Sequence, residues 1–400
     1  MRGDRLMDGQ RTTETTGYFD RDAADLETFA ALTARALMAA DVPQAAEIHE
    51  NIPVYDAAAL APALEDPVSR RALMAEWARC LKDTSGVLVL AGAYADTSII
   101  DRATDVFTRI IADERAATGG GADHFAAAGA NDRIWNALQK LGMADPQTFV
   151  RYQANVAIDA VCEAWLGPGY QMTAQVNLVR PGGAAQQPHR DYHLGFMTTE
   201  RAASYPAHVH DLSPVLTLQG GIAHCDMPVE SGPTRLLPFS QLFRAGYLAF
   251  GREDFRAHFD AHAVQLPLAK GDAIFFNPAL YHGAGENRSA DIQRMANLLQ
   301  ISSPMGRAME TVDRLGLTKT IFPALRNAVA NGELNDAEAA AVIASTAEGY
   351  SFPTNLDTDP PIGGLAPKTQ ADVLREALRD GWSEDALAEV LKAQEVRRRA

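Results

Sequence analysis

Apolar residues recur at helical spacing along the first part of the chain. The four segments with this spacing are residues 22–40, 67–81, 97–115 and 147–165. Pro67 suits the first turn of its segment, because the N–H that proline lacks has no partner inside a helix at that position. The run GVLVLAGAY, which begins at Gly86, is instead short and rich in β-forming residues. We therefore predict helices in the four segments and a strand after Gly86.

The pattern changes in the middle of the chain, where short runs of Val, Leu, Ile and Phe are separated by Gly and Pro turns. These runs are MTAQVNLV, VLTLQGGIAH, TRLLPFS, AVQLPLAKGDAIFFNP, LYHGAG and RMANLLQIS. Many short strands without intervening helices favour an antiparallel sandwich or barrel over βαβ units. The predicted fold is mixed α/β, with a mainly antiparallel β core of the jelly-roll or cupin-like kind flanked by N- and C-terminal helices.

Helical spacing returns after Ser303. Leu374, Leu387 and Leu391 belong to apolar stripes that need a partner surface, and Ser383 is a suitable N-cap for the last helix. Between these helices, residues 351–367 are rich in Pro and Gly but also carry large apolar side chains. A disordered linker is usually poorer in such residues, so we predict an ordered strap along the β core, with a flexible tail as the alternative.

Three regions follow from these patterns. Residues 1–74 are expected to form a partly helical N-terminal extension, and residues 75–305 the β domain with its leading helices. Residues 306–400 are expected to form a helical extension that packs on the core.

Composition limits the expected partners. The chain has 36 Lys and Arg against 51 Asp and Glu, which gives a formal charge of −15. Nucleic acids and anionic membranes are bound by clustered basic residues, so neither is an expected partner. No apolar run is long enough to cross a membrane and no apolar leader begins the chain, so we expect a cytoplasmic protein. Cys80, Cys162 and Cys225 have no CxxC spacing and are expected to be reduced thiols.

A candidate metal site begins in the sequence HRDYH. In a strand, His189, Asp191 and His193 would project from the same face. Positions four residues apart in a strand lie about 13 Å apart, at roughly 3.3 Å per residue. Ligands of one ion must approach it to about 2 Å, so His189 can pair with Asp191 but His193 is not a third ligand. The remaining ligand must come from another segment.

A second HxD motif competes with the first. His224 and Asp226 end an apolar run, and His208 and His210 form a further pair in HVHD. His189 follows a Pro-Gly-Gly turn and a Gln-rich loop, where a ligand at the rim of a β core can sit. For His224 we favour a histidine that is hydrogen-bonded at the end of a strand.

The distal part of the site is predicted in KGDAIFFNPALYHGAGENRSADIQRMANLLQIS. His282 stands on a short strand, and Arg294 opens the next apolar strand. A guanidinium at the mouth of a β core can hold a dicarboxylate through a two-pronged ion pair, although a surface arginine is an equal alternative at this stage. Two histidines and one carboxylate form the donor set of non-haem Fe(II) oxygenases.

These motifs together resemble the phytanoyl-CoA dioxygenase family of Fe(II)- and 2-oxoglutarate-dependent oxygenases, which have a double-stranded β-helix. The resemblance covers roughly residues 75–305. It begins at EWARCLKDTSGVLVLAG and continues through NLVRPGGAAQQPHRD, GIAHCDMPVESGPTRLLPFSQ and KGDAIFFNPALYHGAGENRS. In the position of the family's usual histidine after Pro-x-Ser, this chain has Gln241.

The resemblance implies roles for particular residues. His189, Asp191 and His282 correspond to the iron ligands, whereas Asp226 falls on an acidic turn of the family. Arg294 corresponds to the arginine that holds 2-oxoglutarate, but it lies one residue further from the distal histidine than usual. Because of this shift, Arg288 is the alternative clamp. Arg180 matches a basic position that some relatives use near the cosubstrate, so it is a further candidate.

The implied activity is oxidation of a small molecule by O2, Fe(II) and 2-oxoglutarate, with release of succinate and CO2. The carboxylate of Asp191 favours hydroxylation over halogenation, because related halogenases lack it. The alternatives are a cupin-like metal-dependent isomerase or hydrolase and a β-helix protein that binds a small ligand without catalysis.

The substrate is only weakly indicated. Gln175, Asn177 and Tyr192 are candidate substrate residues because of their positions beside the triad. The negative charge disfavours a CoA thioester and favours a small polar or carboxylated metabolite. The oligomeric state cannot be inferred from the sequence.

Overall fold

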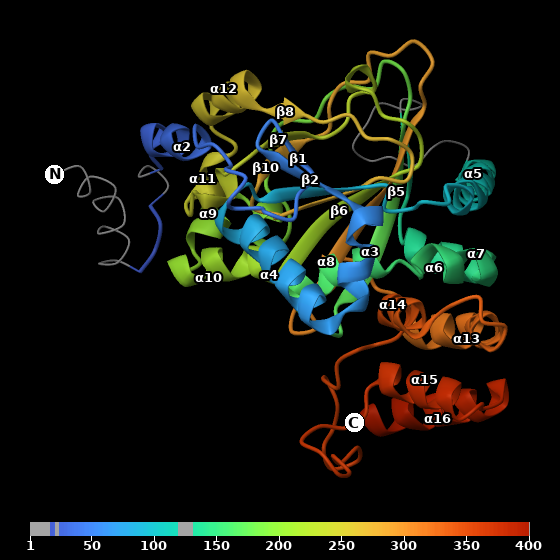
Figure 1. The fold of residues 1–400 in the computed structure, drawn as a ribbon. Coiled ribbons are helices and arrows are strands. Elements are labelled where there is room, and N and C mark those ends of the chain that lie inside the picture. Colours follow the sequence, from blue (N-terminus) through green and yellow to red (C-terminus); the bar gives the residue numbers. More distant parts are fainter. Residues whose placement is uncertain (1–16, 21–23, 119–130, 400) are drawn as a thin grey trace.

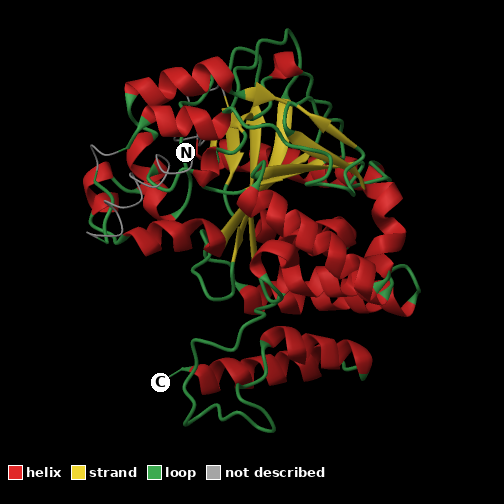
Figure 2. Cartoon of the chain, turned by 60° about the vertical axis from the view of Figure 1, so that its left-hand side comes forward, coloured by secondary structure: helices red, strands yellow, loops and turns green. Residues whose placement is uncertain are grey.

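Two β-sheets form the centre of the protein and helices cover them (Figures 1 and 2). The computed structural model describes residues 17–20, 24–118 and 131–399. The start of the predicted N-terminal extension, residues 1–16, lies outside the described residues. Within the described part, the predicted mainly antiparallel β core with helices before and after it is confirmed.

The larger sheet has eight strands in the order β1-β2-β3-β9-β6-β11-β5-β4. Their bounds are β1 Glu47–His49, β2 Ile52–Asp56, β3 Val87–Ala91, β4 Asn131–Ile134, β5 Gln171–Val179, β6 Thr217–Ala223, β9 Ala273–Phe276 and β11 Arg294–Ser302. Neighbouring strands are antiparallel except for the parallel pair β2 and β3. The smaller sheet has the order β10-β7-β8. Its strands are β7 Arg235–Leu237, β8 Val264–Gln265 and β10 Tyr281–Gly283.

Alternation along the strands gives the large sheet two different faces. The outer face, which includes Leu88, Phe275 and Leu299, packs against helices in the main apolar cluster. The inner face of β2, β3 and β9 packs against the small sheet in a second apolar cluster, which includes Val89 and Leu236. On β5, β6 and β11 the inner face becomes polar. This polar part of the inner face faces the candidate site.

Six helices before the β core lie on the outer face in the described part of the chain. They are α3 Ala57–Glu65, α4 Pro67–Asp83, α5 Ser98–Thr118, α6 Ala137–Ala144, α7 Pro146–Gln153 and α8 Val156–Leu166. The helix α2 Leu26–Thr33 instead packs beside α12 Glu253–His262 and the small sheet, where Phe29 joins an apolar cluster with Leu237 and Tyr281. The single helix predicted for residues 147–165 is instead two helices. Asn155 accounts for the break. Its side-chain oxygen accepts a hydrogen bond from the N–H of Ile158 at 3.0 Å and so caps the N-terminus of a new helix.

Short helices occupy the connections within the β core. They are η1 His193–Phe196, α9 Thr199–Ala203, α10 Ala207–Leu212, η2 Ser213–Leu216, η3 Val229–Ser231, η4 Ser240–Leu242, α11 Gly246–Ala249 and α12 Glu253–His262. The pattern analysis did not identify them. All except α12, which has 10 residues, have too few turns to establish a helical period.

Four helices follow the β core: α13 Arg314–Ala330, α14 Asp336–Thr346, α15 Gln370–Arg379 and α16 Glu384–Arg398. α13 and α14 pack against α6, α7 and α8, and α15 and α16 form a further layer beyond them (Figure 1). Leu325, Val342, Leu374 and Leu391 join the main apolar cluster across these layers. The C-terminal helices therefore continue the core of the β domain through the helices that cover it.

Residues 351–367 do not follow the predicted course along the β core. They lie against the end of α16, where Asn355 and Thr358 donate hydrogen bonds to the carbonyl oxygens of Arg398 and Arg397. The last carbonyls of a helix lack partners inside the helix, which explains why this polar segment binds there. The side chain of Leu365 is fully exposed, at 100%. The apolar content on which the prediction rested therefore does not indicate burial.

Candidate metal centre and cosubstrate site

Three side chains converge between the two sheets. His189 and Asp191 come from the loop after β5, and His282 comes from β10. Each offers one ligand atom, and the three atoms lie within 4.8 Å of one another. Nε2 of His282 is 3.3 Å from Oδ2 of Asp191, and Nε2 of His189 is 3.6 Å from Oδ1. Two imidazole nitrogens and one carboxylate oxygen that face a common point fit Fe(II) as a donor set.

Backbone pairing brings the two segments together. The N–H of His189 donates to the carbonyl of His282 at 3.0 Å, and the N–H of His282 donates to the carbonyl of His189 at 3.2 Å. After Asp191 the chain turns sharply, with φ of 59° at Tyr192 and 40° at His193. His193 then lies beside Ser213, with its Nδ1 3.2 Å from the hydroxyl oxygen. The structure thus groups His189 with Asp191 and leaves His193 out, as the sequence predicts.

The second ring nitrogen of each histidine is held by the backbone. Nδ1 of His189 lies 2.8 Å from the carbonyl oxygen of Gln187, and Nδ1 of His282 lies 2.9 Å from that of Leu280. A carbonyl oxygen can only accept, so both Nδ1 atoms carry the proton and both Nε2 lone pairs face Asp191. Burial lowers the pKa of His189, and the neighbouring His282 adds to this effect. These contacts favour the neutral imidazole that a metal requires.

The carboxylate of Asp191 is kept charged by its surroundings. Burial alone would raise its pKa, but the two neighbouring histidines and a hydrogen bond from Gln219 lower it below the usual range. Gln219 lies on β6 and donates through its amide nitrogen to Oδ2. The sequence analysis missed this residue, although a glutamine within the apolar run VLTLQGGIAH was a visible signal.

Arg190 fixes the segment that carries His189 and Asp191. Its side chain is 1% exposed and points away from theirs. One guanidinium nitrogen donates to the carbonyls of Ser240 and Phe243, at 2.7 and 2.8 Å. The guanidinium also lies over the rings of Tyr247 and Tyr281. A buried arginine held in this way sets the position of the residues on either side of it.

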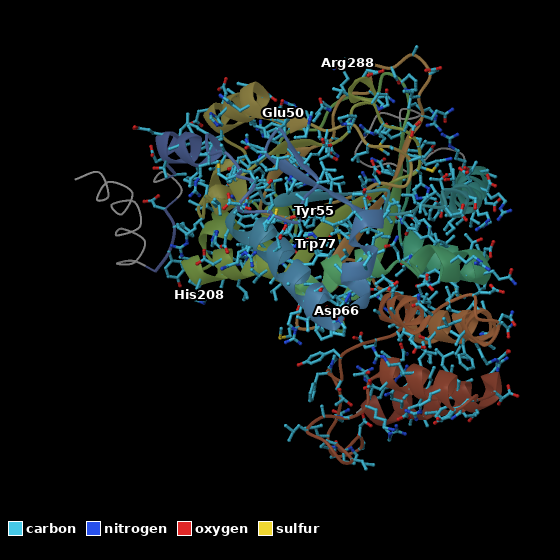
Figure 3. The ribbon with its side chains drawn as sticks, viewed as in Figure 1. Glu50, Tyr55, Asp66, Trp77, His208 and Arg288 are labelled. Carbon is cyan, nitrogen blue, oxygen red and sulfur yellow. The ribbon has the colours of Figure 1, made fainter. Side chains whose placement is uncertain are left out.

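Arg294 and Arg288 occupy very different positions. Arg294 opens β11, is 6% exposed, and projects from the same sheet face as Gln219. Its Nη1 donates to the carbonyls of Ser231 and Gly285, at 3.2 and 3.3 Å, and burial lowers its pKa to about 10. No carboxylate among the described residues pairs with it. Arg288 is exposed on an outer loop (Figure 3).

Arg180 is not brought to the triad. It lies in a cleft of about 400 Å³ on the outer face of the sheet, which α5 borders and Leu178 and His224 also line. There it forms an ion pair with Asp132, which also binds Arg115. Its position therefore gives no support to a role in binding the cosubstrate.

The three predicted substrate residues lie on the inner side of the sheet or next to it. The register pairs Gln175 with Leu298 and Asn177 with Ala296, which places both side chains on the face that carries Arg294. Gln175 accepts a hydrogen bond from Arg133 at 2.9 Å. Tyr192 follows Asp191 directly and donates a hydrogen bond to Gln300 of β11.

The second HxD motif is structural. The two ring nitrogens of His224 lie 2.8 Å from the hydroxyl oxygens of Thr104 and Tyr152, so neither is free for a metal. Burial lowers its pKa to about 3. Asp226 accepts a hydrogen bond from the backbone N–H of Lys270 at 2.9 Å. The interpretation of His224 as a hydrogen-bonded histidine at the end of a strand is borne out.

The histidine pair in HVHD and the three cysteines lie outside the triad. His208 is exposed on α10 (Figure 3), and His210 is buried with Nε2 3.1 Å from the carbonyl oxygen of Ala202. All three cysteines are free thiols. Within the described residues, no helix has the length and apolar character that a membrane crossing requires.

A comparison with known protein families shows to which family the chain belongs. The family described as Phytanoyl-CoA dioxygenase (PhyH) matches residues 83–296, which is more than half of the chain and includes the triad and Arg294. The chain belongs to the phytanoyl-CoA dioxygenase family. The predicted family is thereby confirmed, and Fe(II) and 2-oxoglutarate are the cofactors of this family of dioxygenases.

Curated relatives of this phytanoyl-CoA dioxygenase family member are fungal dioxygenases. Over 136 residues the chain is 29% identical to the dioxygenase trt7 of Aspergillus terreus. This alignment covers 34% of the chain and 42% of the relative. It is 27% identical over 139 residues to the dioxygenase andF of Emericella variicolor, with 34% and 43% covered. The chain thus spans less than half of the length of these relatives.

Solved structures resemble this member of the family more distantly. The epimerase SnoN, solved with Fe3+, alpha ketoglutarate and nogalamycin RO, is 19% identical with a TM-score of 0.40. That alignment covers 60% of this chain and 85% of the other.

Gln241 is the main departure from the family pattern that the sequence revealed. Its amide nitrogen donates to the carbonyl of Thr84 at 2.8 Å, and its side chain lies directly against Gly86. A Cβ at position 86 would lie 2.4 Å from the Gln241 amide, and Gly86 has a φ of 78°. Gln241 thus joins its turn to the end of α4 and to the start of β3.

Proposed function

We propose that the protein is an Fe(II)- and 2-oxoglutarate-dependent dioxygenase that hydroxylates a small metabolite. In the balanced reaction, one oxygen atom of O2 enters the substrate as a hydroxyl group and the other enters succinate, with release of CO2. The observation that carries this proposal is the convergence of His189, Asp191 and His282 within 4.8 Å, with both Nε2 atoms facing the carboxylate.

The proposed roles follow from the surroundings of each residue. His189, Asp191 and His282 would hold Fe(II), which supplies the activation of O2 when it is bound. Arg294 would bind the distal carboxylate of 2-oxoglutarate, because its buried guanidinium has only carbonyl partners among the described residues. Arg288 is the alternative clamp, but its exposure makes it the weaker one. Arg180 remains a prediction that its place on the outer face does not favour.

We also propose that the two sheets form a double-stranded β-helix. The pairing of His189 with His282 adds a further edge to the small sheet opposite β6 and β11 of the large sheet. In this arrangement, Gln175, Asn177 and Tyr192 would line the substrate pocket around the metal. The reaction would take place in the cytoplasm, where three unpaired thiols remain reduced.

Two other functions compete with this one. A cupin-like isomerase or hydrolase could use the same triad with another metal, but it would not need the buried guanidinium of Arg294. A binding protein without catalysis would not need the backbone contacts that orient both imidazoles. Both features favour the dioxygenase.

The direct test measures succinate release by the purified protein with Fe(II), ascorbate and 2-oxoglutarate, in the presence of a library of small metabolites. We expect slow release without a metabolite and faster release with the substrate. No succinate under any of these conditions, from protein that binds iron, would contradict the proposal.

A further inference from the structure

A carboxylate from outside the family match reaches the inner wall of the candidate site. Glu310 lies in the loop between β11 and α13, and the family match ends at residue 296. Its Oε1 accepts a hydrogen bond from the backbone N–H of Asn136 at 2.6 Å. The adjacent Met309 has its sulfur 4.0 Å from the amide nitrogen of Gln175, which is on the inner face of β5. This loop therefore lies over the polar part of the inner face.

The other oxygen of Glu310 is buried, and no described residue forms a hydrogen bond with it. Burial raises the pKa of Glu310, although the N–H of Asn136, the charge of Lys140 and the nearby polar groups of Gln175 and Ala174 act in the opposite direction. Lys140 is engaged by Glu114 and is not in contact with Glu310. An unpaired buried acceptor destabilises the folded protein, so an oxygen in this state needs a reason.

Tyr192 links the triad to the part of the inner face near Glu310. It follows Asp191 directly, and its hydroxyl donates to Gln300, on the same face of β11 as Arg294. The preceding residue of β11 on this face is Leu298, which pairs with Gln175, and Gln175 contacts Met309. The candidate metal ligands and the loop that carries Glu310 thus approach neighbouring positions of the inner face.

A second buried acceptor points the same way. Oε1 of Gln219 has no hydrogen-bond partner among the described residues, and its identity as oxygen is fixed because the amide nitrogen donates to the carboxylate of Asp191. Two side chains on different elements thus leave an acceptor oxygen unpaired in this region. Acceptors of this kind are satisfied by a ligand that carries hydroxyl or ammonium groups.

The rim next to this region is apolar. Phe196 is 60% exposed and its ring contacts that of Tyr192, with centroids 6.1 Å apart. Met309 is 36% exposed beside Gln175. Large exposed apolar side chains beside buried polar groups suit a ligand with an apolar body.

We propose that Glu310 determines substrate specificity by accepting a hydrogen bond from a hydroxyl or ammonium group of a substrate whose remaining body is apolar. This inference rests on the proposed function, since it concerns the same site. The sequence favoured a small polar or carboxylated metabolite, and of these a carboxylated substrate would be repelled by Glu310. The residue binds the substrate and takes no part in the chemistry at the metal.

Glu310→Gln separates this role from a structural one. The glutamine oxygen can still accept the bond from Asn136, so the loop stays anchored. The amide nitrogen replaces the unpaired oxygen with a donor, which reverses the preference of the site. Glu389→Gln is the matched control, because Glu389 is exposed on α16, in the layer furthest from the sheets.

The test uses 1-decanol, decylamine and decanoate, which share one apolar chain. Binding to the anaerobic protein loaded with Fe(II) and 2-oxoglutarate is measured from the ligand-induced shift of Tm. For the wild-type protein and for Glu389→Gln, we expect decylamine and decanol to bind at least about tenfold more tightly than decanoate. In Glu310→Gln, we expect decylamine to lose about tenfold in affinity and decanoate to gain.

Three results would overturn the inference: wild-type protein that prefers decanoate, wild-type protein that binds no member of the series, or a Glu310→Gln protein with unchanged preferences. A lower Tm without a change of preference would indicate a structural residue. Succinate release in air is measured in parallel. If the wild-type protein releases succinate but Glu310→Gln keeps the wild-type order of affinities, only this inference is refuted. If Glu310→Gln reverses the order of affinities but the wild-type protein releases no succinate, only the proposed reaction is refuted.

Discussion

At the scale of single residues, the candidate metal site depends on contacts that fix each ligand atom. Backbone carbonyls hold Nδ1 of both histidines, and Gln219 holds the carboxylate of Asp191. The three ligand atoms are therefore oriented before any metal arrives, which reduces the entropy lost on binding.

Replacing His189, Asp191 or His282 with alanine should abolish stoichiometric Fe(II) binding, because two ligands cannot close the site. We expect iron content to fall from about one ion per chain to background and turnover to stop. Metal analysis after anaerobic loading measures this. His193→Ala and His208→Ala should retain their iron, and loss of iron from either would show that the site has been assigned to the wrong residues.

Arg294→Ala should weaken 2-oxoglutarate binding while iron stays bound. Loss of a charge-assisted pair costs about 2 kcal/mol, so the KM for 2-oxoglutarate should rise roughly 30-fold. Steady-state kinetics and metal analysis measure the two effects separately. Arg288→Ala, at an exposed position, should change the KM little. The opposite order of the two variants would move the clamp to Arg288.

The residues of the triad could be predicted from the sequence because an HxD pair and a distal histidine carry their own spacing signal. Gln219 and Arg190 could not be assigned, since their partners lie 28 and 50 residues away and only the folded chain brings them together. Glu310 lies outside every motif, and its unpaired oxygen is visible only once burial is known.

At the scale of elements, the segment from Gln187 to Tyr192 has little regular structure of its own. It is held on one side by the pairing of His189 with β10 and on the other by Arg190. Gly246 permits this anchor, because a Cβ there would lie 2.1 Å from the guanidinium carbon of Arg190.

Arg190→Met should destabilise the protein and weaken Fe(II) binding together. Two buried carbonyls would lose a charged donor, which we expect to lower the free energy of unfolding by about 3 kcal/mol. Urea unfolding and iron titration measure the two effects. Arg201→Met on α9, where the side chain is exposed, should stay within about 0.5 kcal/mol of wild type. An Arg190→Met protein with unchanged stability and iron affinity would show that Arg190 does not anchor the site.

Most strands of the β core could be predicted, because short apolar runs between Gly and Pro turns have few other interpretations. The strands β1, β2 and β4 were not predicted. The helix boundaries could be predicted less well. A continuous apolar stripe over residues 147–165 gave no sign of the break, which depends on a cap by Asn155. The prediction for residues 351–367 was wrong for a different reason. Hydrogen bonds to α16 fix the course of this segment, and its apolar side chains do not.

At the scale of the whole molecule, the C-terminal extension forms one continuous core with the family domain. Arg314 joins them directly, since it donates to the carbonyl of Met172 in β5 at 2.5 Å and to that of Ser345 in α14 at 2.8 Å. We propose that residues 306–400 are required for folding and also, through Glu310, for substrate recognition.

Truncation after Ser303 should expose the apolar surfaces of α6, α7 and α8 that α13 and α14 cover. We expect aggregation or a Tm too low to measure, because removal of a large part of the core exceeds the stability of a typical domain. Expression tests and binding of a hydrophobic dye measure this. A soluble and fully active truncated protein would show that the extension is dispensable.

The central claim is that the triad supports oxidation coupled to 2-oxoglutarate. Its most direct test is a reaction under oxygen-18 gas with Fe(II), 2-oxoglutarate and ascorbate, followed by mass spectrometry of the succinate. The account predicts succinate that carries one heavy oxygen atom with the wild-type protein, and no succinate with Asp191→Ala. Unlabelled succinate, or equal labelled succinate from both proteins, would contradict it.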